Sequence, residues 1–550
     1  MSAEKTSIFG FQNWSGEIRK YLTVDCIAGF TLWAMIVPEA VAYATMANAP
    51  TPAAGLYGIL FVLPVYAIFA SSRYVVATST AAISVTTAGF LAALGSGTPE
   101  VFSSLIIASA IVYLLFWHFR LGFIADFISE PVSRGFMLGL SIFIVVGQLP
   151  KLFGIEKGSG NTFEQAFSLA GNLGDTNPAT LICGALVAII LIGSEKINPR
   201  IPGGLLALVL SVIGFSLFGW AGRYGIDMVG ALPAGLPAIT IPRPDFAQLP
   251  IIIPAAIGLV VLAISEATVL ASSLAIEHDQ ELDVDQQFLA FGLGNLAGGL
   301  FGGLLGAGST SSTLVNHDAG AKTLMSTVWA ALFTLVTILF LTGLFAFLPE
   351  VFLGVLIIHA VWHLLRFRKI LHVRNYSRGE FNLAAIAMLA VLLFDVLYGL
   401  VIAMALNIIY FAYKTSRVKV EEFGTLNDSN HTLMPVSFEH VVPAPDNCIA
   451  LGLTQGSIFY ASARSAVEQS NAIIRQHPDA TNVIISVERI NSFDFTSQKM
   501  LRDFEAMVRK SGKRLYITNV RSQHALDQLR KAGFDPGLVD ISLHLDITKI

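Results

Sequence analysis

Long apolar segments occupy most of the first 413 residues of the chain. A helix that spans a membrane needs about 20 mostly apolar residues, and fourteen candidate segments meet this description, some of which could fuse or split. They lie near residues 24–43, 53–70, 79–95, 101–119, 131–149, 179–194, 202–219, 251–273, 286–304, 309–318, 321–347, 349–365, 381–394 and 396–413. The sequence therefore predicts an α-helical polytopic membrane protein.

Charged residues divide the chain into two parts. Residues 1–420 hold 21 Lys/Arg and 23 Asp/Glu, which is 44 of 420 or about 10%, whereas residues 421–550 hold 28 of 130 or about 22%. The second value is close to the roughly 25% of soluble domains. We therefore expect a transmembrane domain over residues 1–420 and a soluble domain over residues 435–550. The net charge of −4 does not indicate a nucleic-acid partner.

Basic loop residues predict the orientation of the spans. With fourteen spans and a cytoplasmic amino terminus, most loop Lys and Arg fall on the cytoplasmic side, including a cluster at residues 366–378. The opposite loops keep only Lys151, Lys157, Arg223 and Arg243. This bias fits the positive-inside rule. We expect a multi-pass protein of the inner or plasma membrane with both termini in the cytoplasm.

Two segments are unusually small and hydroxylic for helices that face lipid. They cover residues 75–82 and 304–313, and a Gly-Leu-aromatic-Gly sequence precedes each one, at 55–58 and 299–302. Half-helices whose amino termini meet at the membrane midplane offer free N–H groups and positive dipole ends to an anion. Transporters with inverted repeats use such helices in corresponding positions. The alternative is that these residues only allow helices to pack closely.

Two carboxyl groups lie inside predicted spans. Glu266 is in the middle of an apolar segment, and Glu39 follows Pro38 in the first one. An ionisable side chain in a membrane is costly and indicates a buried partner or a role in proton or cation movement. The alternative is a structural carboxyl that hydrogen-bonds across helices. We expect His317 and His359 to make ordinary buried hydrogen bonds or to face an interface.

The chain resembles the sulfate permease (SulP) family of anion transporters over nearly its whole length. The similarity is carried by residues 25–31 and 37–44 of the first span, by 54–58, and by 295–303, 308–316 and 319–323 of the ninth and tenth spans. The resemblance implies a seven-plus-seven inverted repeat of fourteen spans, divided into a core and a gate subdomain. It also implies a homodimer that works by elevator-like alternating access.

The resemblance places an anion between the two half-helices. The residues that it assigns to the substrate site are Glu39, Tyr43, Ser79, Thr80, Ala81, Ser309, Thr310, Ser311 and Ser312. Glu266 falls where many bacterial members have an acidic residue linked to H⁺ or Na⁺ coupling, so the resemblance suggests Na⁺ near Glu266 as a metal ion. No other metal and no cofactor is expected.

Three positions depart from the family pattern. Many relatives have Gln where Glu39 stands, and a carboxylate there could repel anions unless it is protonated or paired. The Gly-Pro often found near Ala77-Thr78 is absent. Relatives often carry Arg at the position of Ser312, so helix dipoles and hydroxyls are left to hold the anion.

The tail alternates strand-like and helical segments from about residue 435. The strands are expected near 448–453, 482–487 and 514–518, and the helices near 460–476, 496–511 and 522–532, which predicts a mainly parallel sheet with covering helices. Residues 493–497 resemble the phosphorylatable loop of STAS domains, which habitually follow SulP membrane domains. The match gives Thr496 the hydroxyl position and Asp494 the acidic one, both regulatory, with a cytoplasmic protein as a partner. The alternative is that Thr496 simply caps a helix.

The sequence therefore predicts a secondary active transporter, and not an enzyme. Its substrate would be a small anion such as sulfate, bicarbonate or a dicarboxylate, in symport with H⁺ or Na⁺. The absence of a Walker motif argues against an ATP-driven pump. Three alternatives remain open: an uncoupled anion exchanger or channel, a nucleobase–cation symporter on the same fold, and a membrane-anchored STAS signalling scaffold.

Overall fold

Two compact units make up the chain, Met1–Asn407 and Ile408–Ile550. The computed structural model describes residues 15–534, apart from 96, 124–128, 198–201, 243–245, 363, 366, 427–428, 439, 454–457, 489 and 491. Residues 535–550 of the predicted cytoplasmic domain lie outside the described residues, as do Arg243 and Arg366 of the predicted loop charges.

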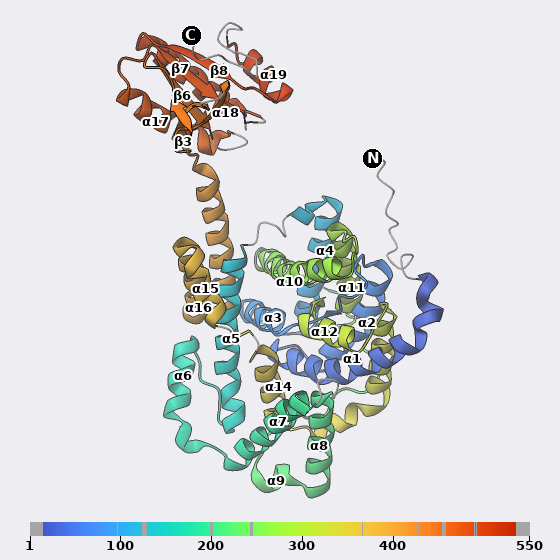
Figure 1. Ribbon diagram of the computed structural model, residues 1–550. Coiled ribbons are helices and arrows are strands. Elements are labelled where there is room, and N and C mark those ends of the chain that lie inside the picture. The colour runs from blue at the N-terminus through green and yellow to red at the C-terminus, as the bar shows by residue number, and fades with distance from the viewer. Residues whose placement is uncertain are drawn as a thin grey trace. The chain divides into compact units, whose positions relative to one another are not determined.

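The first unit consists almost entirely of helices (Figure 1). They are α1 (Ile18–Met46), α2 (Ala54–Phe69), α3 (Ala81–Ala93), α4 (Pro99–His118), α5 (Glu130–Phe153), α6 (Thr162–Gly171), α7 (Pro178–Ile197), α8 (Gly203–Phe218), α9 (Trp220–Tyr224), α10 (Leu249–Glu277), α11 (Val284–Leu300), α12 (Thr310–Asp318), α13 (Met325–Val336), α14 (Glu350–Trp362), α15 (Phe367–Tyr376) and α16 (Arg378–Ser416), whose last residues belong to the second unit. Two short strands precede two of these helices: β1 (Ala77–Thr78) ends two residues before α3 begins its capped turn at Thr80, and β2 (Ala307–Gly308) ends directly before Ser309, the cap of α12.

The helices match the apolar segments of the sequence. Within the described residues, seven helical stretches are long and apolar enough to cross a membrane, and four shorter apolar helices accompany them. Each of the fourteen predicted segments falls on helical structure, the last two both within α16. The prediction of a polytopic α-helical protein is confirmed.

Helix α16 contains a sharp bend where the sequence predicts a boundary between spans. A Cβ atom built on Gly399 would lie 2.7 Å from the Cα of Val391. Residues eight positions apart in a straight helix are separated by about 12 Å. The chain therefore folds back between Val391 and Gly399, so that the helical residues of α16 form two helical segments that correspond to the two predicted spans.

The two halves of the helical unit repeat the same order of elements. α1, α2, β1, α3 and α4 in the first half correspond to α10, α11, β2, α12 and α13 in the second. The first helix of each half packs against helices of the other half: α1 contacts α12 and α13, and α10 contacts α3 and α4. β1 and β2 pair antiparallel, Ala77 opposite Gly308 and Thr78 opposite Ala307. This reciprocal packing is the arrangement expected of an inverted repeat.

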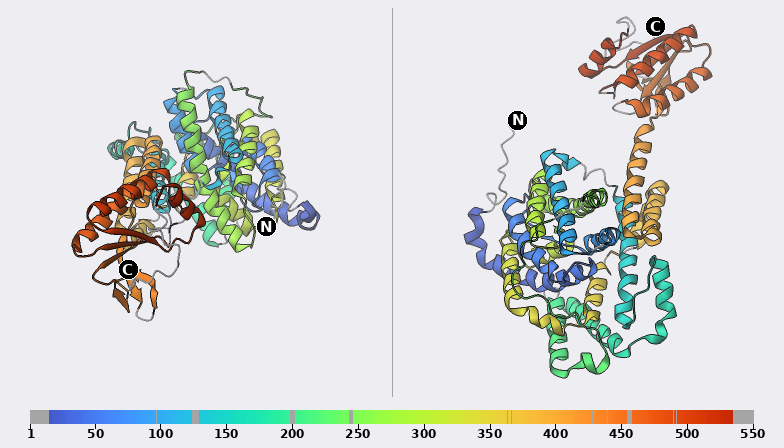
Figure 2. Two further views of the ribbon diagram at one scale, coloured as in Figure 1. Left: turned by 90° about the horizontal axis from the view of Figure 1, so that it is seen from above. Right: turned by 180° about the vertical axis from the view of Figure 1, so that it is seen from behind.

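The second unit is a sheet with helices packed against it (Figure 2). Its strands are β3 (Val420–Leu426), β4 (Ser429–Pro435), β5 (Val441–Pro443), β6 (Cys448–Leu453), β7 (Asn482–Ser486) and β8 (Arg514–Thr518), and its helices are α17 (Tyr460–Gln476), α18 (Phe495–Lys510) and α19 (Gln523–Lys531). β6, β7 and β8 run parallel, as the alternating pattern predicts.

The start of this sheet differs from the sequence-based boundary at residue 435. β3 pairs antiparallel with β6 from Val420 onward, and β4 and β5 both pair with β3. The buried side chains of Val418 and Val420 also belong to the hydrophobic core of this unit. The predicted start was wrong by about 15 residues because β3 and β4 are polar and follow directly on a long helix.

Close backbone approach at Gly308 positions β2 against α10. A Cβ atom at Gly308 would lie 2.6 Å from the Cβ and 2.8 Å from the Cα of Ala267. Real Cβ atoms do not approach so closely, so any side chain at this position would push β2 away from α10. Gly308 therefore fixes the distance between the second broken segment and the helix that carries Glu266.

We predict that Gly308→Ala destabilises the helical unit. Overpacking of this kind costs about 1–3 kcal/mol, so the apparent melting temperature of the purified protein should fall. The control is Gly193→Ala in α7, where an added Cβ meets nothing within 4 Å and helix propensity favours alanine. Equal melting temperatures for the two variants would contradict the proposed role of Gly308.

Candidate functional site

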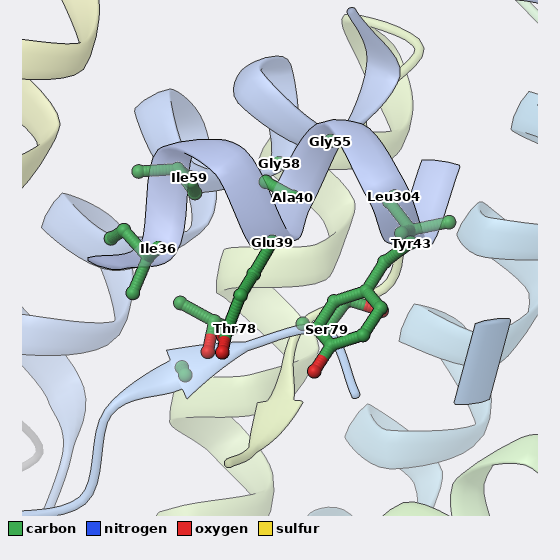
Figure 3. Close-up of a pocket in the computed structure, with 12 residues that line it drawn as sticks. Ile36, Glu39, Ala40, Tyr43, Gly55, Gly58, Ile59, Thr78, Ser79 and Leu304 are labelled. Carbon is green, nitrogen blue, oxygen red and sulfur yellow. The ribbon is translucent and has the colours of Figure 1, made fainter. Parts of the chain in front are cut away.

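A small pocket lies where α1 faces the two short strands. Glu39 and Tyr43 point from α1 towards Thr78 and Ser79 at the end of β1 (Figure 3). The pocket is lined by Ile36, Glu39, Ala40, Tyr43, Gly55, Gly58, Ile59, Ala77, Thr78, Ser79, Leu304 and Gly306. Both halves of the repeat therefore contribute to it.

Hydroxyl side chains cap the two half-helices that follow the strands. The N–H of Ile83 donates to Oγ1 of Thr80 (3.3 Å), and the N–H of Ser312 donates to Oγ of Ser309 (3.3 Å). The first N–H groups of a helix have no partner inside the helix. The N–H of Ala81 at the start of α3 and that of Thr310 at the start of α12 can therefore donate to a ligand. Two such termini, each with a positive dipole end, suit a negatively charged ligand.

The broken backbone ahead of each half-helix is hydrogen-bonded inside the protein. The N–H of Val76 donates to Oγ1 of Thr313 (2.9 Å), and the N–H of Ser309 donates to the carbonyl of Val76 (3.1 Å). Asn295 holds Gly306 from both sides, because it accepts from the glycine N–H (2.6 Å) and donates to the glycine carbonyl (2.8 Å). Non-helical backbone at membrane depth needs this internal satisfaction.

Glu266 on α10 is connected directly to the cap of α3. Oγ1 of Thr80 donates to Oε2 of Glu266 over 3.0 Å. The side chain of Tyr43 is close enough to the carboxyl groups of Glu39 and Glu266 to interact electrostatically with both. Thr80 therefore links a carboxylate on one helix to the amino terminus of another, and Tyr43 lies near both acidic groups.

The pocket is lined by one carboxyl group and several hydroxyls. None of the twelve described residues that line it is basic, and the Glu39 carboxylate has no hydrogen bond or ion pair within the described part of the chain. Glu39 is only 7% exposed. Ser312 is buried, and its hydroxyl lies 3.0 Å from Oγ1 of Thr78 and 3.1 Å from Oγ of Ser309.

The structure brings most of the predicted site residues together. Glu39, Tyr43 and Ser79 line the pocket. The other predicted residues form the caps and first turns of α3 and α12: Thr80, Ala81, Ser309, Thr310, Ser311 and Ser312. Among them, the side chain of Thr310 is exposed.

Sequence reasoning missed three residues that organise this site: Thr78, Asn295 and Thr313. Thr78 and Thr313 belong to the small, hydroxylic runs that indicated the breaks. Their partners lie more than 230 positions away in the chain, and no local pattern indicates such pairs. Asn295 is an amide in the interior of an apolar span, and the cost of burying it unpaired could have marked it.

In the second unit, Asp494 caps α18. Its Oδ1 accepts from the N–H of Ser497 (2.7 Å), and its Oδ2 accepts from the N–H of Tyr460 (2.7 Å). Burial alone would raise the pKa of Asp494, but these hydrogen bonds from Ser497 and Tyr460 hold it below its usual range. The alternative interpretation of Thr496 as the cap is wrong, because Thr496 is an exposed residue in the first turn.

Comparisons with known proteins agree with the architecture. A model of the sulfate permease family matches residues 22–387. A protein of Mycobacterium tuberculosis named a probable sulfate transporter is 29% identical over 395 residues, which cover 71% of this chain and 70% of that protein. Probable sulfate transporter 3.5 of Arabidopsis thaliana is 28% identical over 524 residues, covering 91% and 81% respectively.

Two solved structures are also similar. SLC26A9 superposes with a TM-score of 0.89 at 19% identity and covers 97% of this chain and 91% of its own, which shows a shared fold that includes the C-terminal sheet. The transmembrane domain of the bicarbonate transporter BicA from a cyanobacterium gives a TM-score of 0.59 at 27% identity, covering 70% of this chain and 97% of its own.

We predict that Asp494→Ala weakens the start of α18 by about 1 kcal/mol, as the loss of a cap does. Because the folded pKa is lowered, the charged cap stabilises fully above the unfolded pKa of about 4, and this stabilisation is lost as pH falls through the folded value. Hydrogen exchange of α18 in the full-length protein, corrected for intrinsic rates, should show a difference from wild type that shrinks at low pH. Asp503→Ala, on an exposed position of the same helix, is the control and should show none.

Proposed function

Because the chain belongs to the sulfate permease family of anion transporters, we propose that it is a secondary active transporter in which H⁺ or Na⁺ accompanies the anion. The observation that carries the proposal is the hydrogen bond from Thr80 to Glu266. It connects the helix terminus expected to hold the anion with the carboxyl expected to take up the cation. A change in charge at Glu266 would therefore act directly on the cap of α3.

The charges around the pocket favour coupling. When both Glu39 and Glu266 are ionised, an entering anion meets two negative charges and the positive ends of two helix dipoles, each worth roughly half an elementary charge. The dipoles offset only part of the repulsion. Uptake of a proton or sodium ion by a carboxylate would remove it, so that anion and cation enter together.

The substrate is proposed to be a small oxyanion of the sulfate, bicarbonate or dicarboxylate class. Relatives named as sulfate transporters and one named as a bicarbonate transporter support this class. Hydroxyls and backbone N–H groups donate hydrogen bonds to oxyanions of either planar or tetrahedral shape. Without a basic residue in the pocket, we expect weak discrimination among such anions.

Movement is proposed to follow an elevator-like mechanism. α3 and α12 pack within the group formed by α1, α10 and their neighbours, whereas α5, α7, α8 and α14 pack on one another as a second group. The first group would carry the anion past the second.

We further propose a homodimer in the inner or plasma membrane with cytoplasmic termini. Asp494 and Thr496 would lie on the surface that binds a cytoplasmic protein.

We predict that Glu266→Gln abolishes accumulation of the anion against its gradient in proteoliposomes while exchange of labelled anion continues. The amide keeps the shape but cannot take up a proton and is a poorer sodium ligand. Uptake of sulfate, bicarbonate and succinate should be measured under an imposed proton or sodium gradient, with Glu195→Gln in α7 as the control. Unchanged gradient-driven accumulation would support an uncoupled exchanger, and competition by uracil would support a nucleobase symporter.

Ionisation of Glu39 would repel the anion, so we expect the apparent KM of the wild type to increase with pH. We predict that Glu39→Gln lowers this KM and makes it depend less on pH. Removing one charge near the anion is worth about 2–4 kcal/mol at an effective dielectric constant of 20, so an effect of tenfold or more is expected at alkaline pH. Glu39→Asp keeps the charge and should retain the pH dependence of KM. If Glu39→Gln and wild type have the same KM at every pH, Glu39 does not repel the anion.

A further inference from the structure

Two histidines meet at the carboxyl ends of the helices that carry the site. His278 follows the last residue of α10, and His317 lies in the last turn of α12. Their Nε2 atoms are 2.9 Å apart, and both side chains are partly buried. The carboxylate of Glu277 is beside them, and the ligand atoms of all three residues lie within 4.8 Å of one another.

Neighbouring groups orient both imidazoles. The ring of Tyr74 stacks on His278 with centroids 4.3 Å apart and meets His317 edge-on at 5.7 Å. A carboxylate oxygen of Asp318 lies 3.6 Å from Nδ1 of His317. At this distance the oxygen is a charged neighbour of Nδ1 and not a hydrogen-bond acceptor. A small rotation of the exposed Asp318 side chain would give the carboxylate–histidine arrangement that commonly supports a metal-binding imidazole.

We propose that Glu277, His278 and His317 bind a divalent transition-metal ion of the zinc class. Two imidazoles and one carboxylate form a ligand set that zinc uses with a water in the fourth position. Zinc–nitrogen bonds of about 2.0–2.1 Å in a tetrahedron place the two nitrogens about 3.3 Å apart, so the pair needs to separate by only a few tenths of an ångström. Glu277 is exposed at the helix end, where its side chain can turn towards the ion.

A hydrogen bond between two neutral imidazoles explains less of this arrangement. It accounts for the distance between the Nε2 atoms, but it gives no role to Glu277 or to Asp318 behind His317. Arg73, which precedes Tyr74 in the chain, pairs with Glu17 at 3.3 Å. The local charge is therefore compatible with a divalent cation.

An ion at this position would tie α10 to α12. α10 carries Glu266, and α12 begins with the cap and hydroxyls of the candidate anion site. Tyr74, which contacts both histidines, lies three residues before β1. The ion would therefore fix the ends of two site helices and the segment that leads to the first broken helix.

Metal binding is tested on the purified full-length protein, prepared without a polyhistidine tag. Zn²⁺ alone is titrated against a competing indicator chelator for wild type, His278→Ala and His317→Ala. Each variant should lose one bound Zn²⁺ per chain. The matched controls are His372→Ala and His359→Ala. His372 is an exposed residue of α15, and His359 pairs with Glu195. Both control variants should bind Zn²⁺ as wild type does. Wild-type stoichiometry and affinity in both His278→Ala and His317→Ala would overturn the proposal.

Two exposed substitutions keep the proposal testable if a histidine variant does not fold. Asp318→Asn should weaken Zn²⁺ binding about 10–100-fold, the usual effect of losing the carboxylate behind a ligand, and Glu277→Gln should weaken it at least as much. Both residues are exposed, so the fold should persist, as size-exclusion profiles would verify. Affinities equal to wild type in both variants would overturn the proposed site.

Discussion

The pairing of β1 with β2 is the interaction on which the helical unit depends. Two breaks in transmembrane helices expose backbone groups where no water is available, and each unsatisfied group would cost several kcal/mol. Two residues from each break pair with one another, and the side chains of Thr313 and Asn295 satisfy the backbone beside them. Either break alone would lack its partner, so the two must form together.

This mutual dependence explains why the site sits at the symmetry element of the repeat. The strands can pair antiparallel only where the two halves meet in opposite directions, and each strand then leads into a half-helix. The amino termini of α3 and α12 are consequently held at the same place. Ser312 and Thr78 join the halves through their hydroxyls, so the two halves also meet through side chains beside the paired strands.

Much of the fold follows from the sequence because local physics determines it. Apolar length predicts the spans, and the alternating pattern predicts the parallel strands of the second unit. The positions of the two broken helices were indicated by runs of Ser, Thr and Gly. The contact between Thr80 and Glu266, which are separated by 186 positions, could not be predicted from the sequence, because only the packing of α10 against α3 creates it. The start of the second sheet at Val420 was also missed, since β3 gains its stability from pairing with β6.

The lengths of α10 and α12 give the pair of helices a mechanical property. α12 has nine residues and is about 13 Å long, and the twelve positions from Glu266 to His278 on α10 span about 18 Å. Each helix therefore joins the anion site to the histidine cluster by less than four turns of continuous hydrogen-bonded backbone. A rigid shift of α12 along α10 would change both the spacing of the caps and the spacing of the histidines, because each helix is a continuous rod between the two places.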